Sequence, residues 1–309
     1  MIVFVIRRLV YCLGLLLVVP TAVFILLRLG GDPITGFVPP GTPPEQQQVI
    51  RKRFGLDRPL PEQYLTYLSR AARGDFGESW RARRPAMDAA LERLPATLRL
   101  AGLALAIAIA VGVPLGLLAG SRPGGLVDWL ASSIALLGQA IPGFILGTLL
   151  ILLFAVRLHW LPSSGGDGWR ALILPAVALA AYPAAIIARL LRSSLHDTLG
   201  ADYVRTARGK GLSERGVLLG HTLRNAVLPA LAYIGIQAGF LIGGAVVIEG
   251  VFAYPGIGQL ALGAVSNRDL PVVQAVVVIV AALIIATGFL VDLIATLIDP
   301  RLRLREGQV

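Results

Sequence analysis

The stretch that decides the fold is DYVRTARGKGLSERGVLLGHTLRNAVLP, residues 202–229, a polar and basic segment inside a very apolar chain. Apolar sequence ends before it near Ala188 and resumes after it near Ala226, which predicts a loop between two membrane spans. Gly209-Lys210-Gly211 divides this loop because glycine is a poor residue for a helix interior. The pattern therefore predicts a short helix, a glycine hinge and a second helix that Ser213 can cap.

The first of these helices is predicted to be amphipathic and to lie at the membrane surface. Tyr203, Val204 and Ala207 follow the i, i+1 and i+4 spacing of one helix face. Arg205 and Arg208 fall on another face. Such a helix is suited to docking in a groove on a partner protein. The alternative is that its basic residues only set the membrane topology.

Composition excludes an ordinary soluble globule. The 309 residues are 56% hydrophobic and 15% charged, with a mean hydropathy of +0.75. The net charge of +10 could suggest nucleic acid, but aromatic residues are few and the basic residues cluster in loops, so no nucleic-acid partner is expected. Cys12 is the one cysteine, which precludes an intramolecular disulfide, and the scattered His159, His196 and His221 predict no metal site.

Six apolar segments are long enough to cross a bilayer as helices. The first, residues 9–27, follows Arg7-Arg8 and shows no clear cleavage site, so a retained span is expected rather than a signal peptide. The other five cover approximately residues 100–120, 130–156, 171–188, 226–248 and 271–298. An even number of spans places both termini on the same side of the membrane.

Basic residues in the short loops set the orientation, because positive charge favours the cytoplasmic side. Twelve fall in loops assigned to the cytoplasm: Arg7, Arg8, Arg122, Arg192, Arg205, Arg208, Lys210, Arg215, Arg224, Arg301, Arg303 and Arg305. Three fall outside: Arg157, Arg170 and Arg268. Both termini are therefore expected to be cytoplasmic.

The chain is expected to divide into a first span (1–29), a helical extracytoplasmic segment (30–94), a five-helix core (95–298) and a cytoplasmic tail (299–309). The loop at 192–225 belongs to the core. Within the external segment, turns are predicted at 30–33 and 39–40 and helices at 45–53, 62–73 and 85–94. The second of these helices carries Tyr64, Leu65, Tyr67, Leu68 and Ala71 on one face. The segment could receive a binding protein or could simply cover helix ends.

The sequence DYVRTARGKGLS, followed by HTLRN and a proline, resembles the cytoplasmic coupling loop (the "EAA" loop) of ABC importer permeases. It is most similar to the dipeptide, oligopeptide and nickel permease family, which reads DYVRTARAKGLS, HxLRN and proline. Ala207 and Gly211 match the second alanine and the glycine of the general motif. Arg205 stands where the general motif has glutamate, as is usual in the peptide branch. GDP, FGLDRPL, GDFG and RLPATL extend the resemblance over nearly the whole chain.

This resemblance implies an all-α integral membrane protein with six transmembrane helices and the type I ABC importer permease architecture, in a bacterial or archaeal inner membrane. It implies a second, homologous permease, forming a heterodimer, with two ATP-binding subunits and an extracytoplasmic solute-binding protein. It places ATP and Mg²⁺ on the ATPases and no cofactor on this chain, which lacks G-x-x-x-x-G-K-[ST]. The residues implied to couple it to an ATPase are Asp202, Tyr203, Val204, Arg205, Thr206, Ala207, Arg208 and Gly211.

The expected activity is inward movement of short peptides by alternating access, without catalysis in this chain. Nickel chelates and glutathione are alternative cargoes. An ion-gradient-driven transporter is an alternative class, although that class usually shows internal repeats and acids buried in the membrane. Glu249, Gln237 and Asp292 are candidates for the translocation pathway or its gate, with a structural role as the alternative for both acids.

Glycines recur at intervals of four within the spans, as close helix contacts require. They are Gly112, Gly116 and Gly120, then Gly143 and Gly147, then Gly235, Gly239 and Gly243. Packing within the chain is the simplest expectation for all of them. The last triplet is the candidate for a face that slides against or mates with the second permease. Pro114, Pro142, Pro175 and Pro183 are expected to kink or bound helices.

Overall fold

The computed structural model describes residues 2–29, 34, 38, 41–53, 55–121, 123–164, 168–213 and 216–298. These residues form helices and no strand, apart from one isolated antiparallel bridge between Glu78 and Pro85. The turns predicted at 30–33 and 39–40, the predicted cytoplasmic arginines Arg122 and Arg215, and the tail 299–309 lie outside the described residues.

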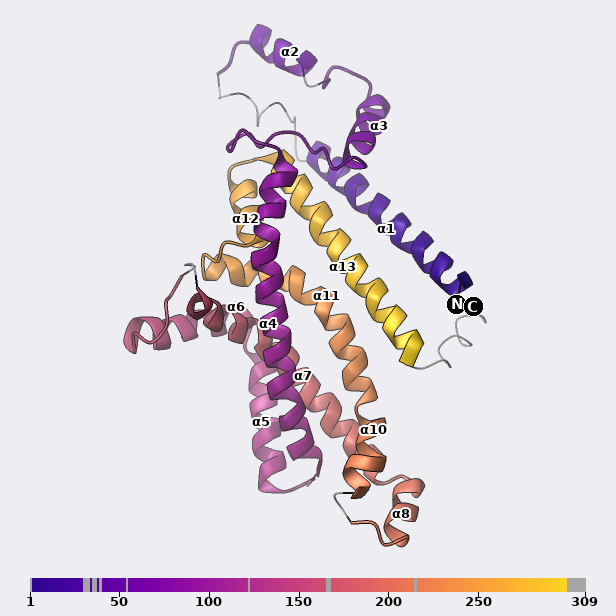
Figure 1. Ribbon diagram of the computed structural model, residues 1–309. Helices are drawn as coiled ribbons and strands as arrows, with labels where there is room; N and C mark the ends of the chain where they lie inside the picture. Colours follow the sequence, from indigo (N-terminus) through magenta and orange to yellow (C-terminus); the bar gives the residue numbers. More distant parts are fainter. Residues whose placement is uncertain are drawn as a thin grey trace. The chain divides into compact units, whose positions relative to one another are not determined.

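The helices fall into two compact units, Met1–Thr97 with Pro255–Val309, and Leu98–Tyr254. Unit 1 holds α1 (Ile2–Leu29), α2 (Pro44–Arg53), α3 (Leu60–Ala71), the start of α4 (Ala86–Ser121), α12 (Ile257–Ser266) and α13 (Leu270–Ile298) (Figure 1). Unit 2 holds the rest of α4, α5 (Leu126–Ala140), α6 (Gly143–Leu150), the π-helix η2 (Ile151–Arg157), α7 (Trp169–Leu199), α8 (Asp202–Gly209), the π-helix η3 (Val217–Thr222), α10 (Leu223–Ala226) and α11 (Leu228–Val251).

Among the described residues, five helices are long and apolar enough to cross a membrane, and the number is six if a bent pair, α5 with α6 and η2, is counted as one span. The prediction of one continuous span over residues 130–156 is wrong, because this pair turns through 102° at Ile141-Pro142. Proline lacks an N–H and disfavours helical geometry in the residue before it. Ile141 is accordingly extended, with φ −89° and ψ 116°.

The prediction of a separate helix at 85–94 is also wrong, because α4 continues for 36 residues through Pro95. A buried stripe explains the continuity, since its members recur at helical spacing on both sides of the proline. It comprises Ala86, Ala90, Thr97, Leu100, Ala104 and Ala108. Burial along one unbroken face therefore outweighs the tendency of proline to end a helix.

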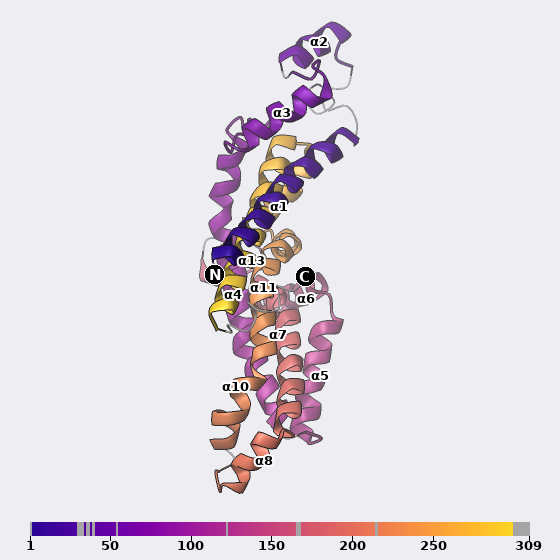
Figure 2. The same cartoon turned by 90° about the vertical axis from the view of Figure 1, so that its right-hand side faces the viewer.

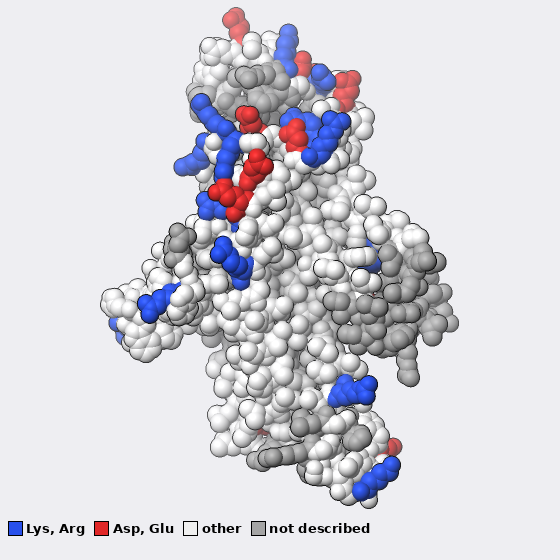
Figure 3. Space-filling model, viewed as in Figure 1, with Lys and Arg blue, Asp and Glu red and all other residues white. Residues whose placement is uncertain are grey.

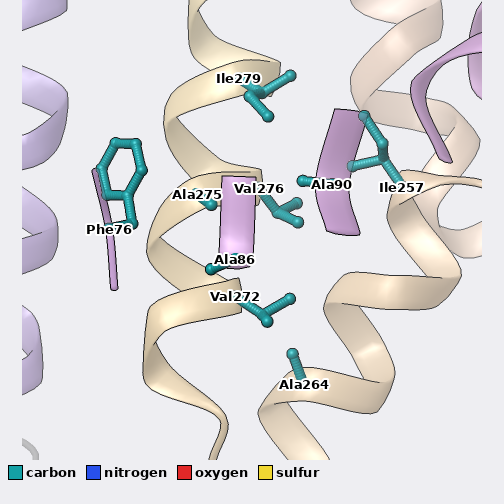
Figure 4. Packing of buried hydrophobic residues seen from close by; sticks show 9 residues of the cluster. All are labelled: Phe76, Ala86, Ala90, Ile257, Ala264, Val272, Ala275, Val276 and Ile279. Carbon is teal, nitrogen blue, oxygen red and sulfur yellow. The ribbon is translucent and has the colours of Figure 1, made fainter. Parts of the chain in front are cut away.

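Unit 1 has an aliphatic core in which Phe76 packs with α4, α12 and α13 (Figure 4). Its members are Phe76, Ala86, Ala90, Ile257, Ala264, Val272, Ala275, Val276 and Ile279. The small alanines let the three helices approach closely. The helices predicted at 45–53 and 62–73 correspond to α2 and α3, but Leu65 is 65% exposed rather than part of the covered face of α3.

Contacts near both ends of α1 hold it to the other helices of unit 1. Arg8 forms an ion pair with Asp292 of α13. Toward the other end, Phe24 lies 5.4 Å from the ring of Tyr64 and 5.5 Å from that of Tyr67, and the Thr21 and Tyr64 hydroxyls are 2.7 Å apart. Burial, with a smaller effect of Tyr64, raises the pKa of Tyr67 to about 12.

A buried carboxylate fixes the loop that precedes α4. Asp269 is 4% exposed and accepts a 2.6 Å hydrogen bond from the hydroxyl of Ser79, which is 3% exposed. It also accepts from the backbone N–H groups of Trp80 (3.2 Å) and Arg81 (3.4 Å). The acid thus ties residues 79–81 to the turn between α12 and α13.

Asp269→Ala is expected to lower the free energy of unfolding by about 1–3 kcal/mol, because a buried hydroxyl and backbone N–H groups lose their acceptor. Asp75→Ala is the control, since Asp75 forms a half-exposed pair with Arg70 at 2.8 Å, and exposed pairs contribute about 0–1 kcal/mol. Thermal unfolding of the two purified variants in detergent measures the difference. Equal melting shifts would contradict this role of Asp269.

Unit 2 is built around α7, which contacts α5, α6, α10 and α11. The glycine face of α4 lies directly on α7. A Cβ at Gly112 would lie 2.6 Å from the Ala184 carbonyl, and one at Gly116 would lie 2.7 Å from the Ala188 carbonyl. One at Gly120 would lie 2.9 Å from Cδ2 of Leu195. The prediction of packing within the chain is confirmed for this triplet.

Candidate functional site

The 192–225 loop contains the predicted amphipathic helix as α8, Asp202–Gly209. The helix ends before Gly211, whose φ of +80° lies in the left-handed region that glycine adopts without strain. After this hinge the hydroxyl of Ser213 accepts a hydrogen bond from the N–H of Gly216 at 3.3 Å, as expected for a capping residue. The helix, hinge and helix pattern predicted from the sequence is confirmed.

The covered face of α8 packs against another segment of the same chain. Val204 is fully buried and Ala207 is 6% exposed, and both pack against Val217 of η3, which is also fully buried. Val204 and Ala207, which were expected with Tyr203 to fill a groove on another protein, are thus covered within the chain, and the contact of the three with a partner stays a prediction. An apolar face on a short helix is covered, and here the chain's own next helix covers it.

The opposite face of α8 is exposed and polar, comprising Asp202, Tyr203, Arg205, Thr206 and Arg208. An i, i+3 ion pair joins Arg205 to Asp202 at 3.6 Å. Tyr203, 43% exposed, accepts a 3.0 Å hydrogen bond from Asn225, which ties α8 back to α10. Blue Lys and Arg groups mark this end of unit 2 in Figure 3, while the helices that adjoin it are nearly all white.

The segment under α8 has π-helical hydrogen bonding. The N–H of Leu223 donates to the Leu218 carbonyl, five residues back. The buried Thr222 hydroxyl donates to the Val217 carbonyl at 3.1 Å, which also spans five residues. π-Helical turns are rare and are frequently found at functional sites. In this protein one supports the covered face of α8.

The three predicted pathway residues lie on two helices, α11 and α13. Glu249 is fully buried near the end of α11, while Gln237 is half-buried earlier on the same helix. Phe252, 2% exposed, follows Glu249 and packs against Gly147 of α6, where a Cβ would lie 2.9 Å from its ring. Asp292 belongs to unit 1 and is paired with Arg8, which favours its structural role.

One polar cluster was missed in the sequence. Asp128, in the first turn of α5, is 4% exposed and accepts hydrogen bonds from both Nε and Nη2 of Arg192 on α7, the second at 2.9 Å. The N–H of Gly124 donates to it at 2.9 Å and the Ser132 hydroxyl at 3.1 Å. An acid in the first turn of an apolar helix was the available signal, since that position also suits the helix dipole.

These features define a class. The chain is a multi-span α-helical membrane protein with a short amphipathic helix presented outside its spans, and its described residues contain no group of three His, Cys, Asp or Glu that could hold a metal ion. Residues 112–304 match the family described as binding-protein-dependent transport system inner membrane component, and residues 1–101 match its N-terminal family.

Relatives cover almost the whole chain. The glutathione transport system permease protein GsiC of Escherichia coli K12 is 40% identical over 301 residues, which is 97% of this chain and 98% of that protein. A putative peptide permease protein of Brucella suis is 40% identical over 311 residues, covering 96% and 98%. The chain belongs to the binding-protein-dependent inner membrane component family, and is an ABC importer permease subunit of the peptide and nickel branch.

Solved structures support the same fold. The MetNI methionine ABC transporter in an inward-facing conformation matches with a TM-score of 0.59 and 21% identity, over 69% of this chain and 97% of that chain. An amino acid ABC transporter matches with a TM-score of 0.51 and 18% identity, over 69% and 94%. The fold is that of a type I ABC importer permease. The protein is a multi-pass protein of the inner membrane.

Proposed function

We propose that α8 docks on a separate ATPase subunit through its exposed face, and that this contact drives alternating access of a pathway through the permease. The observation that supports this proposal most directly is that α8 has one buried face and one exposed face. Val204 and Ala207 attach the helix to η3, so a force on α8 is transmitted to the chain. Tyr203, Arg205 and Arg208 remain exposed for a partner. The permease itself is then a non-catalytic subunit.

The proposed assembly contains two ATPases carrying ATP and Mg²⁺, a second and distinct permease, and an extracytoplasmic solute-binding protein. In this arrangement α8 and both termini face the cytoplasm, in agreement with the distribution of basic residues in the short loops. Of the glycine triplet on α11, Gly235 and Gly243 are half-buried and are the proposed contact with the second permease, whereas Gly239 is buried within the chain. The family description supports a binding-protein partner.

The proposed cargo is a short peptide. Relatives at 40% identity are named for peptide and for glutathione, and glutathione is itself a tripeptide. Glutathione is accordingly the second candidate. Uptake of tritiated alanyl-alanine, tritiated glutathione and nickel-63 with histidine into vesicles of the whole assembly separates the candidates. Uptake that persists without ATP and stops when the ion gradients collapse would contradict the proposal.

Photocrosslinking tests the docking of α8. In a Cys12→Ala background, Thr206→Cys carrying a benzophenone maleimide is expected to crosslink to the ATPase, because Thr206 is exposed. Val204→Cys, two residues away and fully buried, is the matched control and is expected neither to react with the reagent nor to crosslink. Mass spectrometry of the linked peptides identifies the partner.

Labelled Thr206→Cys that never crosslinks to the ATPase in the assembled transporter would refute docking through this face. Crosslinking from Val204→Cys at the same yield would show that this side chain is exposed, which contradicts the packing of α8 on η3. The reagent also reports exposure directly, since the labelling rate of each cysteine is measured before illumination.

A further inference from the structure

The Asp128–Arg192 pair joins the first turn of α5 to the last turns of α7. Its carboxylate side is enclosed, with a side chain 6% exposed, while the arginine side chain is 41% exposed. Two nitrogens of one guanidinium bind two oxygens of one carboxylate, which fixes direction as well as distance. The Gly124 N–H and the Ser132 hydroxyl occupy the other acceptor positions, so Asp128 is held on its own side of the contact.

Small side chains form part of the surface on which α5 and α7 meet. Ala135 of α5 packs with Ala185 and Ala188 of α7. A Cβ at Gly138 would lie 3.2 Å from the Ala181 carbonyl. Alanine and glycine surfaces allow close approach but interlock little, because they carry no long side chains. The bidentate pair adds a directional contact to this surface, and it fixes the position of Asp128 along α7.

Space for movement lies directly beside the pair. A cavity of about 250 Å³ is bounded by α4, α5 and α7, and its lining includes Leu115, Ser132, Gln139, Arg189 and Arg192. By contrast, α4 is locked on α7 by Gly112, Gly116 and Gly120. Of the two helices that flank α7 here, α5 is the one with room to shift.

Arg192 lies close to the proposed docking helix. It precedes Leu199, where α7 ends, by seven residues, which is about 10 Å along the helix, and α8 begins three residues later at Asp202. Figures 1 and 2 show α8 at the same end of unit 2 as the turn between α4 and α5. At its other end α5 meets the bend at Ile141-Pro142, and α6 beyond it packs by Gly147 on Phe252, three residues after the buried Glu249.

We propose that Asp128 and Arg192 are positioning residues for energy coupling: their ion pair makes α5 move with α7 when α8 is displaced, so that the movement reaches the α5–α6 bend and Phe252. The inference rests on the proposed docking of α8. It assigns the two residues no contact with cargo or nucleotide. Without the pair, α7 moves with the ATPase while α5 lags behind.

The test uses the complete transporter in proteoliposomes, with the solute-binding protein and tritiated alanyl-alanine or glutathione. Arg192→Gln and Asp128→Asn are expected to lower the peptide imported per ATP hydrolysed by about tenfold, within the range that single positions change coupling between distant sites. The rate of ATP hydrolysis is expected to equal that of the parent. The double variant is expected to match the single variants, because both remove the same pair.

Arg189→Gln is the matched control. Arg189 lies one turn before Arg192 on α7 and lines the same cavity, but Asp128 accepts no hydrogen bond from it. Its import per ATP is expected to equal that of the parent. Arg192→Lys keeps the charge without the bidentate geometry, and is expected to give an intermediate ratio.

Parallel loss of hydrolysis and import in Arg192→Gln, with the ratio unchanged, would overturn the proposal in favour of a purely structural pair. If that variant does not assemble, Arg192→Lys decides, since a parental ratio there would show that the bidentate register is not required. Photocrosslinking from Thr206→Cys is repeated in each variant. Its absence already in the parent would refute docking of α8, whereas its persistence with a normal ratio would refute only the role of the pair.

Discussion

Val204→Asp is expected to reduce ATP-driven uptake to background while the protein still inserts in the membrane. Val204 of α8 is fully buried against Val217 of η3, so the substitution places an unpaired carboxylate in an apolar contact. An unpaired buried charge costs several kcal/mol, of the order of 3–5 kcal/mol where a buried partner is missing. The helix is then expected to detach from η3 and no longer to transmit force.

Uptake of a labelled dipeptide and the amount of permease in the membrane are measured on the same cells. Val217→Asp should behave like Val204→Asp, because it charges the same contact from the other side. Leu212→Asp introduces the same charge at an exposed position of the same loop and is expected to leave uptake near the parental value. Normal uptake by Val204→Asp at a normal protein level would show that this contact does not couple the subunits.

Gly116→Val is expected to prevent stable folding of unit 2. The new Cβ would lie 2.7 Å from the Ala188 carbonyl, 2.9 Å from Cβ of Leu191 and 3.1 Å from Cα of Ala188. Two of these atoms are backbone, so no rotamer change relieves the clash and α4 must move off α7. Overpacking in a close-packed core costs about 1–3 kcal/mol, and the two further methyl groups of valine add to it.

The thermal midpoint of the tagged protein in detergent, followed by fluorescence size-exclusion chromatography, measures this effect. Gly102→Val on the same helix is the matched control, because nothing lies within 4 Å of a Cβ built at Gly102. A drop for Gly116→Val alone is the expected result. Equal behaviour of the two variants would contradict close contact of α4 and α7.

The sequence predicted contacts better than it predicted partners. Spacing of four among Gly112, Gly116 and Gly120 indicated a close helix contact, and the partner proved to be α7. Spacing also showed that Val204 and Ala207 lie on a covered face, but the resemblance suggested a partner outside the chain. The periodicity of a sequence indicates that one face of a helix is buried. Only the three-dimensional structure shows which element covers that face.

Proline interrupts the helix at one position and is accommodated within a helix at another. At Pro142 the chain bends by 102°, whereas α4 passes Pro95 as one helix. The local preference is the same at both positions, and the difference lies in the buried surface on either side. Asp128 escaped notice for a related reason, since its partner Arg192 is 64 residues away and no local pattern marks the pair.

The bend at Ile141-Pro142 has a consequence for membrane insertion. α5 has 15 residues, and α6 with η2 has as many, so each arm is about 22 Å long against a hydrocarbon core of about 30 Å. Neither arm can cross lipid alone, and backbone groups released at the bend need protein around them. Both arms contact α7, which the ribosome makes later. We therefore expect the bent pair to enter lipid only together with α7, which shields it.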